Sequence, residues 1–240
     1  MFNFQSNSKT NNFQIIQNEK NVGFSKGNNI GASAAKGKYL FFLNSDTKFQ
    51  NTGLLGMVDF MDKNKEIGVL GARLKNFDGS KQRSVGKFYN IFNTLFMLLG
   101  AEKLGFLRSS PNKIISVDWV SGAAFMIRSE LFKMTGGFDE KLFMYMEDME
   151  LCFRAKKAGY KVFFYPEVNI AHKELGSSNR TFAIVNIYKG LLYFYKKHKS
   201  NHEYLLVKFL LYTKAVIMIL VGSIIKKSYL VITYKKAIQF

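Results

Sequence analysis

The sequence has little cysteine, little arginine and no apolar segment at its start. Cys152 is the only cysteine among 240 residues, which excludes an internal disulfide and suits a reducing compartment. Only six of the 35 basic residues are arginine, whereas proteins that read DNA bases or clamp phosphates usually rely on arginine. Residues 1–12 are polar and lack the apolar stretch of a secretory signal, so we expect none.

Positive charge is what the chain has in excess. Its formal net charge of +18 predicts an anionic partner, which could be nucleic acid, an anionic bilayer surface or a phosphorylated substrate. Residues 181–240 hold ten lysines and one acid, so this quarter of the chain carries +9, half of the total. The basic excess accompanies apolar residues, and no helix-turn-helix, zinc or RNA-binding signature is present. We therefore expect no nucleic-acid partner.

The most apolar segment, residues 204–225, lies within this basic quarter. Its uninterrupted part, residues 215–225, is too short to cross a bilayer, which needs about 20 apolar residues. A helix of this composition with flanking lysines is typical of a segment lying on a membrane, although a helical hairpin packed on the main domain has the same signature. A third possibility is that the segment crosses the membrane once, with the side chains of Lys208 and Lys214 extending to the membrane surface. We expect residues 181–240 to be a helical, lysine-rich segment on the cytoplasmic face of the membrane, the inner leaflet.

Residues 1–180 form a different region, in which strand and helix patterns alternate. This alternation predicts an α/β fold with a mostly parallel, mixed sheet, and ligands bind beyond the carboxyl ends of strands in such sheets. We expect strands at residues 13–17, 39–43, 67–72, within 117–127 and at 160–165, the last ended by Pro166, and helices at residues 25–36, 54–63, 130–134 and 148–158.

Acidic residues stand at two informative places. Asn44, Ser45 and Asp46 follow the apolar run at 39–43, where their oxygens suit Mg²⁺ or Mn²⁺, although such residues also form ordinary turns. Glu147 and Asp148 begin a helix after an apolar run, a setting that suits a general base as well as a simple helix cap.

Other residues near these acids have more ordinary interpretations. We expect Glu150 to be solvated or to cap its helix, and Cys152 to be a core residue. His172 follows a strand and could be structural or a metal ligand, whereas His198 and His202 should be solvated. Trp119 could pack on a sugar face or fill the core.

The order of these segments resembles one known family. The sequences are NVGFSKGNNIG at 21–31, YLFFLNSDT at 39–47, WVSGA at 119–123, GGFDE at 136–140, FMYMEDMELCFR at 143–154, and Gly159, Tyr160 and His172. Together they resemble family 2 glycosyltransferases, in particular the bacterial rhamnosyltransferase-like branch. The resemblance implies a GT-A fold and an inverting transfer of a sugar, possibly rhamnose, from a nucleoside diphosphate donor. The implied acceptor is a saccharide or lipid-linked saccharide in cell-surface polysaccharide synthesis.

The resemblance also assigns roles to individual residues. Asp46 stands where the family has the metal-binding Asp-x-Asp motif, with the amide of Asn44 in place of the first acid. Asp148 falls on the family's catalytic base, and His172 on a histidine that can complete a Mg²⁺ or Mn²⁺ site. The remaining expected contacts are Lys26, Asn28, Asn44 and Ser45 with the nucleotide sugar, and Trp119, Ser121, Gly122, Ala123, Asp139 and Glu147 with the acceptor or sugar.

One departure from the family qualifies these roles. Family members normally begin with a strand, a helix and a second strand that form much of the nucleoside pocket, and this sequence reaches residues 21–24 without them. We therefore expect an amino-terminally truncated GT-A domain over residues 1–180. A second reading is an inactive or partial glycosyltransferase that acts as a non-catalytic membrane-surface subunit.

Overall fold

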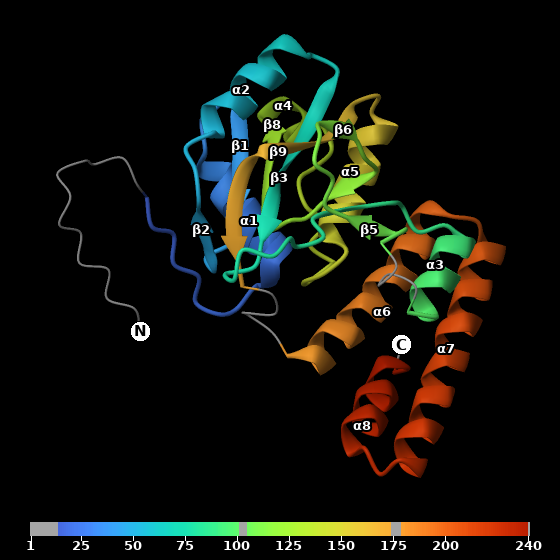
Figure 1. Ribbon diagram of the computed structural model, residues 1–240. Helices are drawn as coiled ribbons and strands as arrows, with labels where there is room; N and C mark the ends of the chain where they lie inside the picture. The colour runs from blue at the N-terminus through green and yellow to red at the C-terminus, as the bar shows by residue number, and fades with distance from the viewer. Residues whose placement is uncertain (1–13, 101–104, 174–178, 240) are drawn as a thin grey trace.

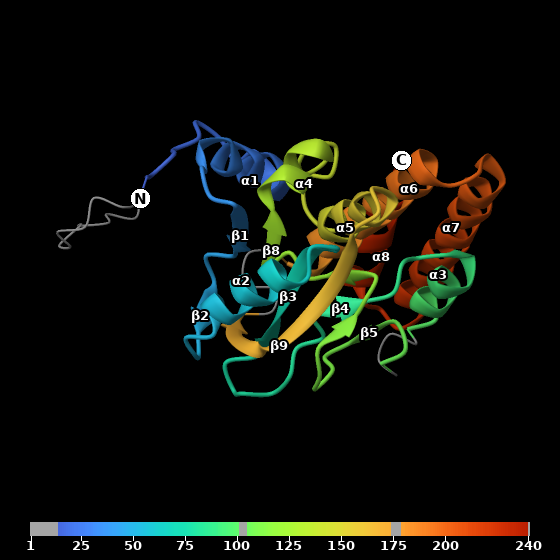
Figure 2. The ribbon, with the colours of Figure 1, turned by 90° about the horizontal axis from the view of Figure 1, so that it is seen from above.

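A central sheet lies in the middle of the molecule, and helices pack on both of its faces (Figures 1 and 2). The computed structural model describes residues 14–100, 105–173 and 179–239. The helices are α1 (Gly23–Ala34), α2 (Leu54–Lys63), α3 (Ile91–Leu98), α4 (Ser129–Met134), α5 (Glu147–Lys157), α6 (Arg180–His198), α7 (Asn201–Ile224) and α8 (Ser228–Ala237).

The strands form one large sheet and one small sheet. The large sheet has the order β1 (Tyr39–Leu43), β8 (Ala124–Arg128), β3 (Ile67–Lys75), β9 (Lys161–His172) and β2 (Thr47–Phe49), and β6 (Ile115–Ser116) also pairs with β9. The β3–β9 pair is parallel, and the other pairs among the described strands of this sheet are antiparallel. The small sheet has the order β5 (Arg108–Ser109), β4 (Val85–Gly86) and β7 (Trp119–Val120). The predicted α/β fold with a mixed sheet is confirmed.

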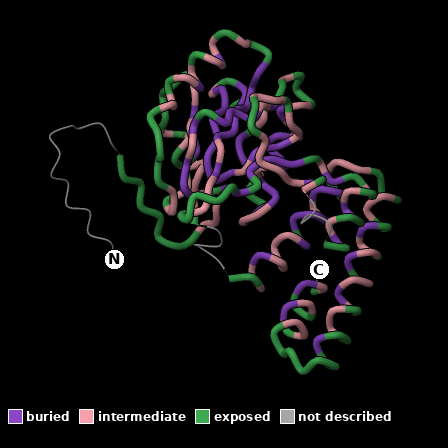
Figure 3. Tube along the Cα trace, viewed as in Figure 1, coloured by how far each residue is buried: buried purple, intermediate pink, exposed green. Residues whose placement is uncertain are grey.

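Successive side chains of the central strands pack on opposite faces of the large sheet, as the period of two in a strand requires. Val69 of β3 and Ile127 of β8 belong to the hydrophobic cluster that α5 and α6 share. Their neighbours Leu70 and Met126 belong to the cluster on the other face, which α2 covers with Met57. The sheet is therefore the most buried part of the chain (Figure 3).

Two strand predictions differ from the structure. Residues 14–17 form no strand and are exposed, so the strand predicted there is wrong for those residues; residue 13 lies outside the described residues. β9 continues past Pro166, where the pairing register shifts against Ala72 and Arg73 in an irregularity that accommodates a residue without a backbone donor.

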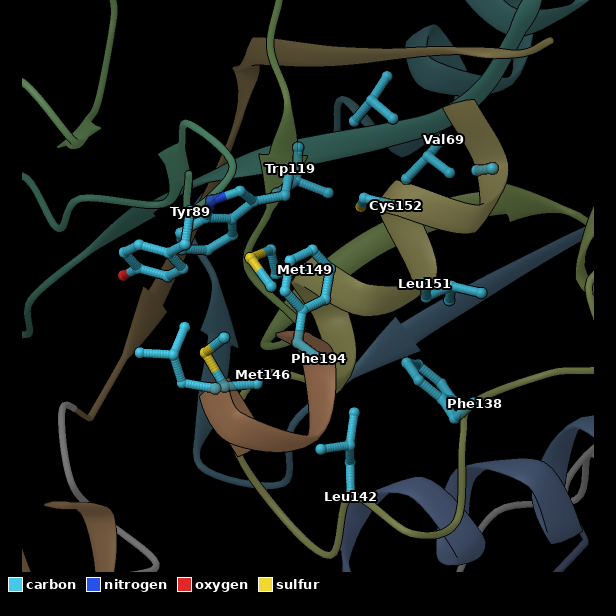
Figure 4. Packing of buried hydrophobic residues seen from close by; sticks show 14 of the residues in the cluster. Val69, Tyr89, Trp119, Phe138, Leu142, Met146, Met149, Leu151, Cys152 and Phe194 are labelled. Carbon is cyan, nitrogen blue, oxygen red and sulfur yellow. The ribbon is translucent and has the colours of Figure 1, made fainter. Parts of the chain in front are cut away.

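The carboxyl-terminal helices share the core of the sheet domain. Phe194 and Leu191 of α6 are fully buried in the same cluster as Met149 and Cys152 of α5. Figure 4 shows Met149, Cys152 and Phe194 in this cluster. Cys152 is a core residue, as predicted. A substantial part of α6 thus packs in the hydrophobic core against α5, the helix that carries Glu147 and Asp148.

Glu150 is fully buried between α5 and α6, so the prediction of a solvated or capping residue is wrong. Its carboxylate accepts hydrogen bonds from Arg154 Nε at 2.8 Å, Lys197 Nζ at 2.7 Å and His198 Nε2 at 2.9 Å. His198, predicted to be solvated, has a side chain only 7% exposed. Burial acts to raise the pKa of Glu150, but the hydrogen bonds from His198 and Arg154 outweigh it and hold the pKa at about 2.

We predict that Glu150→Gln lowers the free energy of unfolding by about 3 kcal/mol at neutral pH, because Arg154, only 15% exposed, loses its countercharge and Lys197 keeps only Asp139. The pKa of Glu150 is lowered in the folded protein, so its contribution is complete above about pH 5 and is lost as the pH falls toward about 2. Urea unfolding of both proteins across this range measures the difference. Glu130→Gln, at an exposed position of α4, is the control. Equal stability of Glu150→Gln and the wild type at neutral pH would contradict the prediction.

Candidate active site

Asp46 and His172 are brought together by the pairing of two edge segments. Asp46 lies in the turn between β1 and β2, and β2 pairs antiparallel with β9 so that Thr47 stands opposite His172. The Asp46 carbonyl accepts a hydrogen bond from the Lys173 N–H at 3.1 Å. His172 Nε2 consequently lies 3.4 Å from Asp46 Oδ1, and 3.5 Å from the side-chain nitrogen of Asn44.

Gln82 fixes the orientation of the His172 ring. Its side-chain nitrogen donates to the Asn76 Oδ1 at 2.7 Å and to the His172 carbonyl at 3.0 Å, so its oxygen must be the atom that faces His172 Nδ1 at 2.9 Å. This places a proton on Nδ1, so that in the neutral tautomer the Nε2 lone pair is directed toward Asp46. A metal-binding histidine usually donates a hydrogen bond from its other ring nitrogen, the one that does not bind the metal, to a partner of this kind.

The Asp46 and His172 pair therefore fits a divalent cation. Asp46 Oδ1 is buried and accepts no hydrogen bond, and in its neutral form the His172 ring presents the acceptor Nε2 to it at 3.4 Å. A cation between these two atoms would satisfy both. Among the described residues no group of three or more His, Cys, Asp and Glu side chains could hold a metal ion by itself. The site matches the usual mode of Mg²⁺ binding, in which one or two protein ligands are completed by substrate phosphates and water.

Glu147 and Asp148 follow a strained turn. Tyr145 and Met146 both have left-handed backbone conformations, with φ of 71° and 73°, which is uncommon for residues with side chains. A side-chain carbon added at Gly190 of α6 would lie 2.9 Å from Met146 Cγ and 3.3 Å from the Tyr145 carbonyl oxygen. The absence of a side chain at Gly190 therefore lets α6 press directly on the turn that positions the two acids.

Asp148 is half-buried, and backbone N–H groups donate to both of its carboxylate oxygens. Its Oδ2 accepts the Gly122 N–H at 2.9 Å, and its Oδ1 accepts the Met149 N–H at 2.7 Å. Burial raises the pKa of Asp148, while these two N–H groups and the positive charge of Arg108 limit the rise. The pKa of Glu147 is raised well above its usual range, because it is buried and lies beside Asp148.

A short backbone path joins Asp148 to the Asp46 turn. The Ala123 carbonyl accepts the Asn44 N–H at 3.0 Å, and the neighbouring Gly122 N–H is the donor to Asp148. Gly122 also packs closely, since an added side-chain carbon would lie 3.4 Å from Asp148 Cβ. The segment 121–123 therefore links the predicted base to the turn that carries the carboxylate of the predicted metal site.

The other predicted site residues are mostly engaged in packing. Trp119 is 5% exposed, and its indole N–H donates to the Lys87 carbonyl at 3.0 Å. Asp139 accepts hydrogen bonds from the Tyr193 hydroxyl at 2.7 Å and from Lys197 at 2.6 Å, both on α6. The Ser121 N–H donates to the Ser84 carbonyl, and the side chain of Asn28 donates to the Phe24 carbonyl. Lys26 Nζ lies 3.9 Å from Glu140 Oε2, and Ser45 lies in the turn after β1.

Gln82, Arg108 and Gly190 were not found from the sequence. Arg108 lies over the ring of Trp119 at 5.2 Å and donates to the Arg83 carbonyl at 3.0 Å, while its buried Nε has no hydrogen-bond partner. Gln82 lies 90 residues before the histidine that it orients. No local pattern marks these residues, because each acts on a side chain from a distant part of the chain.

The sequence matches a known protein family over more than half of its length. The sequence model of "Glycosyl transferase family 2" matches residues 3–133, more than half of the chain. The chain belongs to this family. Rhamnosyltransferase WbbL of Escherichia coli K12 is 30% identical over 160 residues, which cover 62% of this chain and 60% of that protein. An N-acetylglucosaminyl-diphospho-decaprenol L-rhamnosyltransferase of Mycobacterium tuberculosis is 41% identical over 64 residues, 27% of this chain and 21% of that protein.

Solved structures support the fold assignment of this family 2 chain. GalNAc-T7, solved with UDP, GalNAc and Mn²⁺, aligns with a TM-score of 0.50 and 18% identity over 73% of this chain and 35% of that chain. The mannosyltransferase PcManGT of Pyrobaculum calidifontis, solved with GDP-Man and Mn²⁺, aligns with a TM-score of 0.50 and 14% identity over 93% and 56% of the two chains. Both likenesses agree with the predicted GT-A fold, which is confirmed.

We predict that Arg108→Leu raises the pKa of Asp148 further, because it removes a positive charge that favours the carboxylate. The measurement is a carboxyl ¹³C NMR titration, which needs no substrate. Arg108→Lys is the matched control, since it keeps the charge and should leave the pKa close to that of the wild type. An unchanged pKa of Asp148 in Arg108→Leu would show that the charge of Arg108 is not acting on it.

Proposed function

We propose that this chain is an inverting glycosyltransferase that moves a sugar from a nucleoside diphosphate donor to an acceptor hydroxyl. The observation that supports this most is the backbone path through Gly122 and Ala123, which fixes Asp148 relative to the Asp46 turn. One end of this path suits a metal-bound diphosphate and the other suits a base. A group transfer that activates a hydroxyl at one end and stabilises a phosphate leaving group at the other requires this combination.

Asp148 is proposed as the base that takes the proton from the acceptor hydroxyl. The freed oxygen would attack the anomeric carbon while the bond to the diphosphate breaks on the opposite face, and the proton would remain on the Asp148 carboxyl. A single displacement of this kind inverts the anomeric centre. It needs no covalent intermediate and no second catalytic acid, in contrast with the carboxylate pairs of glycoside hydrolases.

Asp46 and His172 are proposed as the protein ligands of Mg²⁺ or Mn²⁺. Such a cation, when bound, would neutralise negative charge on the diphosphate leaving group. Asp46 supplies a hard carboxylate oxygen, and Gln82 keeps the Nε2 lone pair of His172 directed at the same point. The Mn²⁺ in the two solved glycosyltransferase structures supports this choice of metal.

Rhamnose is the proposed sugar, and a saccharide or lipid-linked saccharide of cell-surface polysaccharide synthesis is the proposed acceptor. The support comes from the relatives, because rhamnosyltransferases of Escherichia coli and Mycobacterium tuberculosis, and the O-antigen chain rhamnosyltransferase WbaN of Salmonella anatum, resemble this chain. The chain spans less than two thirds of the length of the first two of these proteins, so their substrates are carried over here as a proposal.

We predict that Asp148→Asn lowers kcat of sugar transfer by at least about a hundredfold, because the amide cannot accept the hydroxyl proton. Binding of nucleoside diphosphates and of Mn²⁺, measured by calorimetry, should remain at the wild-type level. Asp59→Asn, an exposed position on α2, controls for the loss of one negative charge. Unchanged kcat in Asp148→Asn would remove Asp148 as the base, and absence of donor binding in both proteins would favour a non-catalytic role.

We predict that Asp46→Ala weakens Mn²⁺ binding by at least about tenfold and removes the metal dependence of nucleoside diphosphate binding. Titration with Mn²⁺ alone, followed by electron paramagnetic resonance, measures the first effect without any substrate. Gln82→Leu should weaken Mn²⁺ binding less, because the ligands remain but the His172 ring loses its orientation. Asp59→Ala is the control. Equal nucleotide affinity of the wild type with and without Mn²⁺ would contradict the role of Asp46.

A further inference from the structure

The outward side of α7 is apolar along most of its length. Val207, Leu211, Ala215 and Gly222 are buried on one side of this helix, against its neighbours. Large apolar side chains occupy the opposite side, as their three- and four-residue spacing from one another requires. These exposed residues are Leu205, Leu206, Phe209, Tyr212, Ile217, Leu220, Val221 and Ile224.

Neighbouring helices extend this surface. α8 packs against α7 and exposes Tyr229 and Ile232, and α3 lies beside α7 in both ribbon views (Figures 1 and 2). The exposed side chains of α3 are large, with Phe92 at 73% and Phe96 at 53% exposure. We name the exposed apolar residues of α3 and α7 the apolar face. An apolar area of this extent normally marks a binding surface.

The charge around the apolar face selects an anionic occupant. From residue 181 onward the chain has ten lysines, and its single acid, Glu203, is engaged in the capping box at the start of α7. Lys226, Lys227, Lys235 and Lys236 are exposed at the ends of α7 and α8, and among the described residues none of them forms an ion pair with a carboxylate. Apolar side chains bordered by lysines match the headgroup and acyl-chain boundary of an anionic bilayer.

The packing of α7 favours lying on a bilayer over crossing it. By length and composition α7 is able to span a membrane, with a mean hydropathy of 2.0 in its most apolar window and 22% of that window buried. Its inner side, however, is closely packed on α8, where a side-chain carbon at Gly222 would lie 2.8 Å from Leu230 Cβ. α8 is in turn joined to α6 by a hydrogen bond of 2.7 Å between Thr181 and Thr233. A spanning α7 would have to break these contacts.

We propose that the apolar face docks the protein on an anionic bilayer, with its side chains in the headgroup region and the surrounding lysines on lipid phosphates. α7 and α8 pack on α6, which contacts the turn before Glu147 through Gly190 and binds Glu150 through Lys197 and His198. Docking would thus place Asp148 in a fixed position near the membrane surface, where a lipid-linked acceptor would be held; this consequence, unlike the docking itself, rests on the proposed function.

The chain lends itself to a site-specific test of docking. Its only cysteine, Cys152, is buried, and burial raises the pKa of this thiol to about 12, so the native protein resists thiol labelling. Single substitutions Phe209→Cys, Leu220→Cys and Phe96→Cys would each carry an environment-sensitive fluorophore on the apolar face. Leu55→Cys on α2 is the matched control, because Leu55 is 76% exposed and lies outside this face.

The labelled proteins are mixed with vesicles of phosphatidylcholine, with and without phosphatidylglycerol. We expect a blue shift at the three labels of the apolar face with anionic vesicles, and none at position 55. The double variant Phe209→Ser with Leu220→Ser should lower vesicle partitioning by about tenfold or more. Lys226→Gln and Lys227→Gln should each lower it about fivefold on anionic vesicles, and added salt should reduce this difference.

Three results would overturn the proposal. Equal spectra at positions 209 and 55 would show that the apolar face does not enter the bilayer. Resistance of the bound protein to alkaline carbonate extraction would show that α7 spans it. A dimer in solution that Phe209→Ser dissociates, without vesicle binding, would assign the face to a second copy of the chain. Asp148→Asn should bind vesicles like the wild type, so loss of sugar transfer and loss of docking are separate outcomes.

Discussion

The burial of the Glu150 carboxylate between α5 and α6 is the interaction on which the candidate site depends. Three basic groups converge on this one carboxylate, and two of them, Lys197 and His198, come from the end of α6. Because removal of one partner would leave uncompensated charge in the core, the two helices are held in a single register. That register places Gly190 against the strained turn before Glu147, so Asp148, the proposed base, is positioned from both its own helix and α6.

Much of the fold could be predicted from local sequence patterns. The apolar run of β1, the helix α2 and the acids at the start of α5 are all encoded by neighbouring residues. The irregular continuation of β9 beyond Pro166 could not be predicted, because it depends on pairing with β3 almost a hundred residues earlier. The burial of Glu150 was missed for the same reason, since its countercharges lie 47 and 48 residues away on α6.

The site itself was only partly predictable. Asp46, Asp148 and His172 were singled out by residue type and by family resemblance, and the structure brings Asp46 beside His172. What the sequence could not supply is the support of these groups. Gln82 and the N–H of Gly122 act through geometry alone, because a glutamine or a glycine in a loop carries no signature of the side chain that it will orient.

The first turn of α5 shows why composition alone leaves the chemistry open. Its three acids look alike in sequence, yet their surroundings separate them. Glu150 is surrounded by cations, which keep its pKa at about 2, and it serves as a permanent charge in the core. Glu147 is buried without a donor on Oε2, and its pKa is raised well above the usual range. Asp148 lies between these extremes, buried enough to attract a proton and hydrogen-bonded enough to release it. A base for a hydroxyl needs that intermediate setting, and here it arises from the Gly122 N–H and from Arg108, both outside the helix.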